Sequence, residues 1–181
     1  NRDGSGAIAQ FTFPKSGGYA SIAGIAIDAA HARVYAVIQD TSGVTSSKVV
    51  YVNLDGSGSA TTVFDLGAST TTSVPGITID PTHSKVLWCQ FSSGVGASQA
   101  GSIMSGNLDG TGTPVAIYSS EFGCNGLAVN ATTGQLFWAR YQTQDTGNTT
   151  SLIRAGSYDG ATSATTLYSE GANSSSGMAL D

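Results

Sequence analysis

Charge is scarce in this sequence, which has only seven Lys and Arg and twelve Asp and Glu residues among its 181. The net charge of −5 comes without any cluster of basic residues, so the electrostatic footprint of a protein that binds nucleic acid or anionic membranes is missing. No apolar run approaches the roughly 20 residues that a membrane-spanning helix needs. We therefore expect neither a nucleic-acid partner nor a membrane span.

Histidine and cysteine are also rare, with two of each. They do not have the spacing of a zinc site, and no P-loop, Rossmann or nucleophile-elbow motif occurs. Carboxylates in the predicted loops keep Ca²⁺ binding as an alternative, although the pattern requires no cofactor. The sequence predicts a protein that is not an enzyme.

Glycine, by contrast, is abundant, and a five-residue phrase that starts with glycine recurs with a period of about 51 residues. Its copies are residues 24–28, 76–80, 126–130 and 177–181. A second phrase, which ends in Asp-Gly, keeps the same period at residues 1–4, 53–56, 107–110 and 157–160. Two independent phrases with one period indicate an internal structural repeat.

Each repeat contains four short segments of strand-like sequence, which we letter A to D. In the third repeat they are residues 126–130, 135–139, 151–155 and 165–168. The Asp-Gly step between C and D is a hairpin-turn signal. Four-stranded units at this spacing predict an all-β fold, a β-propeller of antiparallel four-stranded blades.

The whole chain is expected to be a single repeat domain. Residues 1–23 would hold a remnant of strand D and a loop, and three repeats would follow at residues 24–75, 76–125 and 126–176. Residues 177–181 would be strand A of a further repeat. Three blades cannot close a propeller, and six would need roughly 300 residues. Since open strand edges pair readily, we expect a second chain to complete the ring, either a complementary fragment or an identical copy.

The repeats resemble a known family. Gly-Leu-Ala-Val at 126–129, Leu-Phe-Trp-Ala at 136–139 and the run to Tyr-Asp-Gly at 158–160 are similar to the YWTD repeat, the class B repeat of low-density-lipoprotein receptors. The resemblance covers essentially the whole chain and implies a propeller with a protein-binding role. Where the family pattern has Asp at the end of strand B, this chain has Ile38, Gln90 and Arg140.

Cys89 ends strand B of the second repeat, and Cys124 directly precedes strand A of the third. These two points lie on the same rim of adjacent blades, so we expect a disulfide, with two small buried thiols as the alternative. Acceptor triplets for N-glycosylation start at Asn130, Asn148 and Asn173. Together with the low lysine content, they favour a secreted, extracellular protein.

The candidate ligand-binding residues gather in the B–C and D–A loops, which share one face of a propeller. Amides, carboxylates and aromatic faces of this kind suit the hydroxyls and C–H faces of a sugar. The candidates are Asp40, Gln90, Phe91, Glu121, Asn125, Arg140, Tyr141, Gln142 and Asp145. Trp88 and Trp138 are expected in the blade core, and His31 and His83, in equivalent turns, in the scaffold.

The sequence therefore predicts a lectin-like, extracellular propeller that binds a sugar or glycoconjugate without catalysis. A protein-binding module of the YWTD type is the first alternative. The second is a calcium-dependent propeller hydrolase or lactonase, whose chemistry would sit at the central channel.

Overall fold

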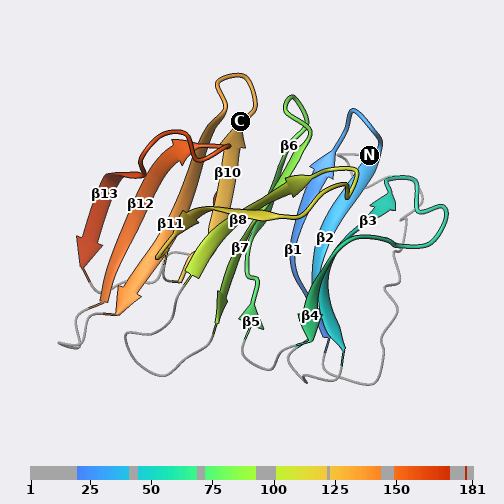
Figure 1. The fold of residues 1–181 in the computed structure, drawn as a ribbon, viewed down its shortest axis with the longest axis horizontal. Helices are drawn as coiled ribbons and strands as arrows, with labels where there is room; N and C mark the ends of the chain where they lie inside the picture. Colours follow the sequence, from blue (N-terminus) through green and yellow to red (C-terminus); the bar gives the residue numbers. More distant parts are fainter. Residues whose placement is uncertain are drawn as a thin grey trace, which may run out of the picture.

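The computed structural model describes residues 20–40, 45–68, 72–92, 101–121, 123–143, 149–171 and 178. These residues form three antiparallel sheets, here called blades 1, 2 and 3, which lie side by side (Figure 1). Each blade runs from strand A to strand D in sequence order. The fold prediction is confirmed: the chain is all-β and forms four-stranded antiparallel blades of a β-propeller.

The strand bounds follow the repeat. Blade 1 consists of β1 (Ala20–Asp28), β2 (Arg33–Asp40), β3 (Ser46–Asn53) and β4 (Thr61–Ala68). Blade 2 consists of β5 (Thr72–Ser73), β6 (Ile77–Asp80), β7 (Lys85–Ser92), β8 (Gly101–Asn107) and β9 (Val115–Ser119). Blade 3 consists of β10 (Gly126–Asn130), β11 (Gln135–Thr143), β12 (Thr149–Ser157) and β13 (Thr165–Gly171).

Strand A departs from the prediction in two blades. In blade 1 it begins at Ala20, ahead of the predicted start at residue 24, with an irregular register between Ile22 and Gly24. In blade 2 it is divided into β5 and β6, both of which pair with β7. Pro75 lies between the two pieces, and because proline has no backbone N–H, it interrupts the ladder there.

The A strands lie next to one another on the inner side of the blades, and β6 contacts both β1 and β10 (Figure 1). The glycine that starts each A phrase allows this approach. A Cβ atom placed on Gly76 would lie 2.6 Å from the carbonyl oxygen of Asn125, and one on Gly24 would lie 3.1 Å from a methyl group of Ile77. The recurring glycine therefore reflects close packing of neighbouring inner strands.

Two apolar clusters fill the interfaces between blades. The cluster between blades 1 and 2 includes Tyr35, Phe64 and Trp88, and the cluster between blades 2 and 3 includes Tyr118 and Trp138. Both tryptophans are fully buried, so their predicted place in the core is confirmed. Each blade thus buries its faces against its neighbours rather than within itself, as expected for stacked repeats.

In blades 1 and 2, one aromatic ring from strand D rests on a glycine of the next blade. Phe64 of β4 lies against Gly106 of β8, and Tyr118 of β9 lies against Gly156 of β12. The Tyr118 hydroxyl accepts the Ser157 N–H at 2.7 Å and donates to the Thr162 carbonyl at 2.9 Å. A side chain at either glycine would collide with the ring, because an added Cβ would fall within 2.4 Å of it or of its hydroxyl.

The turns between strands A and B are built alike. In blades 1 and 2, a buried carboxylate, that of Asp28 or Asp80, accepts the backbone N–H of the histidine three residues later. Its other oxygen contacts the Nδ1 atom of the same histidine, at 2.8 Å for His31 and 2.7 Å for His83. In blade 3, Asn130 Oδ1 accepts two backbone N–H groups at 3.1 Å instead. The histidines therefore belong to the scaffold, as the sequence predicted.

The residue before strand B adopts a left-handed conformation in all three blades. Its φ angle is 52° at Ala32, 54° at Ser84 and 69° at Gly134. Because residues with a Cβ atom are strained in this region, we expect Ser84→Gly to raise the free energy of unfolding by up to about 1 kcal/mol. Urea unfolding measures the change. Thr82→Gly, in the same turn but without a positive φ, should lower stability, and a gain there equal to that of Ser84→Gly would contradict the explanation.

The three described C–D turns hold their aspartates in the ionised form. Hydrogen bonds from the Ser57 and Thr111 side chains lower the pKa of Asp55 and Asp109, and the Ala161 N–H lowers the pKa of Asp159. The folded-state pKa lies below the unfolded one, so this stabilisation is present above the unfolded pKa and is lost as the pH falls through the folded pKa.

The wild-type melting temperature should therefore drop as the pH falls below about 4. A variant with Asn at positions 55, 109 and 159 should drop less, because asparagine can still form the turn but does not titrate. Calorimetry at pH 6 and pH 3 compares the two proteins. An identical drop in melting temperature between pH 6 and pH 3 in both proteins would show that these turns do not contribute to the loss of stability in acid.

Candidate functional site

Most of the polar residues predicted to lie in the B–C loops are strand residues. Asp40 ends β2, Gln90 and Phe91 belong to β7, and Arg140, Tyr141 and Gln142 belong to β11. The placement in loops was wrong because strands B and C stay paired beyond their apolar centres. The last pair is Phe91 with Gly101 in blade 2 and Thr143 with Thr149 in blade 3. The side chains of Tyr141 and Gln142, and all of Asp145, lie outside the described residues.

Glu121, predicted as a ligand of the D–A loop, is buried at the interface of blades 2 and 3. The Trp138 indole N–H donates to its Oε2 atom at 2.8 Å, and Arg140 Nη1 donates to the same oxygen at 3.3 Å. Arg154 Nη1 binds the other carboxylate oxygen, Oε1. Both guanidinium groups also bind backbone carbonyls, Arg140 that of Ser120 and Arg154 that of Ala164. One carboxylate therefore joins two cations and an indole inside the scaffold, an arrangement we call the Glu121 cluster.

Arg154 was not among the predicted residues, although the repeat contains a signal for it. The equivalent positions in strand C are Val50 and Met104. Like Arg154, each pairs with the strand B residue at the position of Trp138 and directly follows the same register shift. A cation at a position that is apolar in the other two blades indicates a carboxylate nearby, which the structure identifies as Glu121.

In blade 2 the indole N–H of the equivalent tryptophan has a different hydrogen-bond acceptor. The Trp88 indole N–H donates to Oε1 of Gln90 in the same strand at 3.2 Å. Gln90 and Arg140 stand at the position where YWTD repeats have aspartate, so blades 2 and 3 each replace that residue with a different polar contact. The role of these residues as sugar ligands stays a prediction.

Asp40 and Asn125 also make internal contacts. Asp40 is buried, its carboxylate binds the Thr45 hydroxyl, and its N–H donates to Ser47 Oγ at 3.1 Å. Asn125 is partly buried, and its N–H donates to the Ala139 carbonyl at 3.1 Å. Neither contact tests a ligand role.

Cys89 and Cys124 form a disulfide that joins β7 of blade 2 to the segment before β10 of blade 3. The predicted pairing is therefore confirmed, and both residues are buried in the core between the two blades. The disulfide and the Glu121 cluster lie at the same interface. Of the predicted glycosylation acceptors, Asn130 is exposed at the end of β10, and Asn148 and Asn173 lie outside the described residues.

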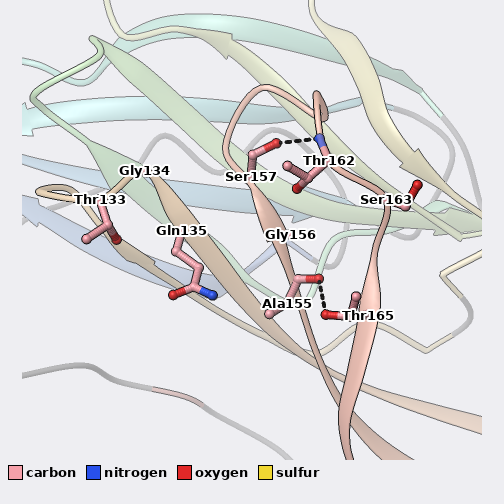
Figure 2. A pocket seen from close by; sticks show the side chains of 9 residues that line it. All are labelled: Thr133, Gly134, Gln135, Ala155, Gly156, Ser157, Thr162, Ser163 and Thr165. Atoms are coloured by element: carbon pink, nitrogen blue, oxygen red, sulfur yellow. Dashed lines mark hydrogen bonds between the residues drawn. The ribbon is translucent and has the colours of Figure 1, made fainter.

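An open pocket of about 310 Å³ lies in blade 3, near the A–B and C–D turns rather than the predicted B–C and D–A loops. Figure 2 shows its hydroxyl and amide groups, which come from the A–B turn, β11, β12, the C–D turn and β13. Ser157 Oγ accepts the Thr162 N–H at 3.0 Å, and the Thr165 hydroxyl donates to the Ala155 carbonyl at 3.4 Å. The lining residues are Thr133, Gly134, Gln135, Ala155, Gly156, Ser157, Thr162, Ser163 and Thr165.

Among the described residues, no group of three or more His, Cys, Asp or Glu side chains is placed to hold a metal ion. The described part of the chain also contains no helix with the length and hydropathy needed to cross a membrane. Calcium binding and hydrolysis stay predictions that rest on the sequence.

No family model matches the sequence, and no curated protein matches it. The chain is similar to solved structures, among them a chain of the nidogen/laminin complex, with a TM-score of 0.63 and 21% identity over 82% of this chain and 48% of that one. TolB from Acinetobacter baumannii matches with a TM-score of 0.52 and 16% identity, over 76% of this chain and 30% of TolB.

The chain thus spans about half the length of the nidogen chain and less of TolB. At these identities the similarity concerns the fold. The resemblance to YWTD repeats, drawn from the sequence, is confirmed at the level of the fold. This chain has the fold of part of a YWTD-type β-propeller, the type of propeller found in nidogen.

Proposed function

We propose that this chain is part of an extracellular, non-enzymatic propeller that binds another protein. The observation that carries the proposal is the similarity of its fold to the propeller of nidogen, a protein whose structure was solved in complex with laminin. Rigid blades with variable connections between strands provide a stable scaffold for recognition.

The contacts of the predicted ligand residues also favour a protein partner over a sugar. Glu121, Arg140 and Asp40 are buried and bonded within the scaffold. Polar groups engaged in this way are less available to the hydroxyls of a sugar, since a ligand would have to replace existing bonds.

An extracellular location is consistent with the disulfide between Cys89 and Cys124. Disulfides persist in oxidising compartments and are rare in the reducing cytosol. The similarity to nidogen points the same way.

Binding measurements on the disulfide-intact chain test the proposal. The immobilised chain would be probed with a panel of purified secreted proteins, laminin among them, and separately with a glycan array. We expect saturable binding of a protein that free sugars do not displace. Saturable binding of a glycan, with no protein bound, would overturn the proposal and support the carbohydrate-binding alternative, with Gln90 and Phe91 as its described candidate ligands. Esterase and lactone assays with and without a chelator test the hydrolase alternative.

A further inference from the structure

The A–B turn of blade 3 exposes an amide at the position where the other two blades bury a carboxylate. Asp28 and Asp80 are fully buried, and each contacts the histidine three residues later. In blade 3 the same position holds Asn130, which is exposed. Its Oδ1 atom accepts the N–H groups of Thr132 and Thr133 at 3.1 Å. Within the described part of the chain, nothing accepts a hydrogen bond from its Nδ2 atom. That nitrogen is therefore accessible for attachment of a group.

The same turn differs from that of blade 2 at the two positions that would prevent glycosylation. An acceptor triplet requires Asn, then any residue but Pro, then Ser or Thr. Blade 2 has Asp-Pro-Thr at 80–82, whereas blade 3 has Asn-Ala-Thr at 130–132. A glycan is bulky and polar, so a folded protein accommodates it only on an accessible side chain. Asn130 has both the required triplet and the required exposure.

A row of paired residues leads from Asn130 to the pocket in blade 3. Asn130 of β10 pairs with Gln135 of β11, which pairs with Ser157 of β12. Paired residues have their side chains on the same face of a sheet, with Cβ atoms about 4.5–5.5 Å apart. Gln135 and Ser157 both line the pocket (Figure 2). The carbonyl of Asn130 also accepts the N–H of Gly134, another lining residue, at 2.8 Å. The acceptor asparagine therefore lies at the edge of the pocket.

The corresponding row in blade 2 is charged and has longer side chains. It consists of Asp80, Lys85 and Asn107, and Lys85 Nζ donates to Asn107 Oδ1 at 2.6 Å. Blade 3 has the shorter, neutral Gln135 and Ser157 in place of the lysine and the asparagine. Blade 1 has the same order of carboxylate, cation and amide as blade 2, in Asp28, Arg33 and Asn53. The pocket thus occurs in the blade whose row has lost both its charges and its longer side chains.

The lining of the pocket suits a neutral sugar. All nine lining residues are uncharged, and five of them carry a hydroxyl group. Hydroxyl and amide groups both donate and accept hydrogen bonds, as do the hydroxyl and acetamido groups of a sugar. The volume of about 310 Å³ is at the small end of the range for small-ligand pockets. It fits the sugars nearest to an asparagine, while the open side leaves room for the rest of a glycan.

We propose that Asn130 carries an N-linked glycan whose first sugars occupy the pocket beside it. In the transfer step, Asn130 Nδ2 attacks the anomeric carbon of an oligosaccharide linked to a lipid diphosphate. The new N–C bond replaces the C–O bond to the diphosphate, which leaves with the bonding electron pair, and Nδ2 loses one proton. Neither oxidation nor reduction takes place. The donor belongs to the secretory pathway, so the proposal rests on the extracellular location proposed above, but not on a protein partner.

Secretion of the full chain from a eukaryotic host tests the attachment, with glycopeptide mass spectrometry as the readout. We expect a glycan on Asn130 of the wild type and none in Asn130→Asp. That variant has the residue of blades 1 and 2, and it keeps an oxygen that can accept the N–H groups of the turn. A secreted chain with its disulfide formed and Asn130 unmodified would overturn the proposal, while the extracellular location would stand.

The rate at which peptide-N-glycosidase releases the glycan from the native protein tests the pocket. The comparison is a double variant, Gln135→Lys with Ser157→Asn, which has the residues of blade 2 at these positions and keeps the acceptor triplet. We expect release from the native wild type to be severalfold slower than from the variant, because sugars in the pocket are shielded from the enzyme. Denatured samples of both proteins should release the glycan at equal rates.

Equal release from the two native proteins would overturn the proposal. A measurement on the unaltered glycoprotein adds a check that does not depend on how the variant folds. Nuclear Overhauser effects should connect the acetamido methyl protons of the first sugar to the methyl protons of Thr133 and Ala155, which line the pocket. If those protons showed contacts with solvent alone, the sugar would lie outside the pocket and the proposal would be wrong.

Discussion

Replacing Glu121 with alanine is expected to lower the free energy of unfolding by about 3–5 kcal/mol, the range for breaking a buried ion pair from one side. The side chain of Glu121 is nearly fully buried, and those of Arg140 and Arg154 are largely buried. Without the carboxylate, two guanidinium groups and the Trp138 indole N–H lose their shared acceptor. The cost arises mainly because buried donors lose a carboxylate that compensates for their removal from water, rather than from lost attraction.

Urea unfolding followed by tryptophan fluorescence measures this change, since Trp138 is a member of the cluster. Glu170→Ala is the matched control, because Glu170 is exposed on β13 and its loss should change stability by no more than about 0.5 kcal/mol. Combining Glu121→Ala with Arg154→Met, the residue that blade 2 has at position 104, should recover part of the loss. Equal urea midpoints for Glu121→Ala and Glu170→Ala would show that the cluster does not stabilise the fold.

Removing the disulfide with Cys89→Ala and Cys124→Ala is expected to lower the free energy of unfolding by about 4 kcal/mol. This is the loop-closure entropy that a cross-link of this span removes from the unfolded chain. The two cysteines are 35 residues apart in the sequence, so the bond closes a long loop in the unfolded chain. It also ties blade 2 to blade 3 inside their shared apolar core. Both effects favour the folded state.

The double variant and the wild-type chain in a reducing agent should unfold at similar urea concentrations, both well below the oxidised wild type. The reducing agent should have no effect on the variant, which controls for other actions of the reagent. If the fully reduced wild type kept the midpoint of the oxidised protein, the disulfide would not contribute to stability.

The repeat made most of the fold predictable. A glycine phrase and an Asp-Gly phrase with one period located the strands of every blade, and they placed Cys89 and Cys124 on the same rim. Such predictions succeed because each blade obeys the same local rules, so three copies of one pattern support one another.

The sequence described the candidate site less well, for a physical reason. Beyond the apolar centre of a strand, polar residues such as Gln90 and Arg140 can be either paired strand or loop, and only cross-strand pairing decides which. Glu121 does stand out from the repeat, but a free carboxylate in a loop and a buried one between two arginines look alike in sequence. The distinction depends on register and on the contact between blades, which no single segment contains.

The unequal interfaces between the blades have a consequence for how the molecule opens. Blades 1 and 2 meet through apolar packing and hydrogen bonds from the Tyr35 hydroxyl to the Leu108 carbonyl and from the Val74 N–H to Gln39 Oε1. Blades 2 and 3, in contrast, are also joined by the disulfide and the Glu121 cluster. In a stack of repeats, cooperativity depends on nearest-neighbour coupling, and weakly coupled units open first. Amide protons in blade 1 should therefore exchange with solvent through a local opening that leaves blades 2 and 3 joined as one cooperative unit.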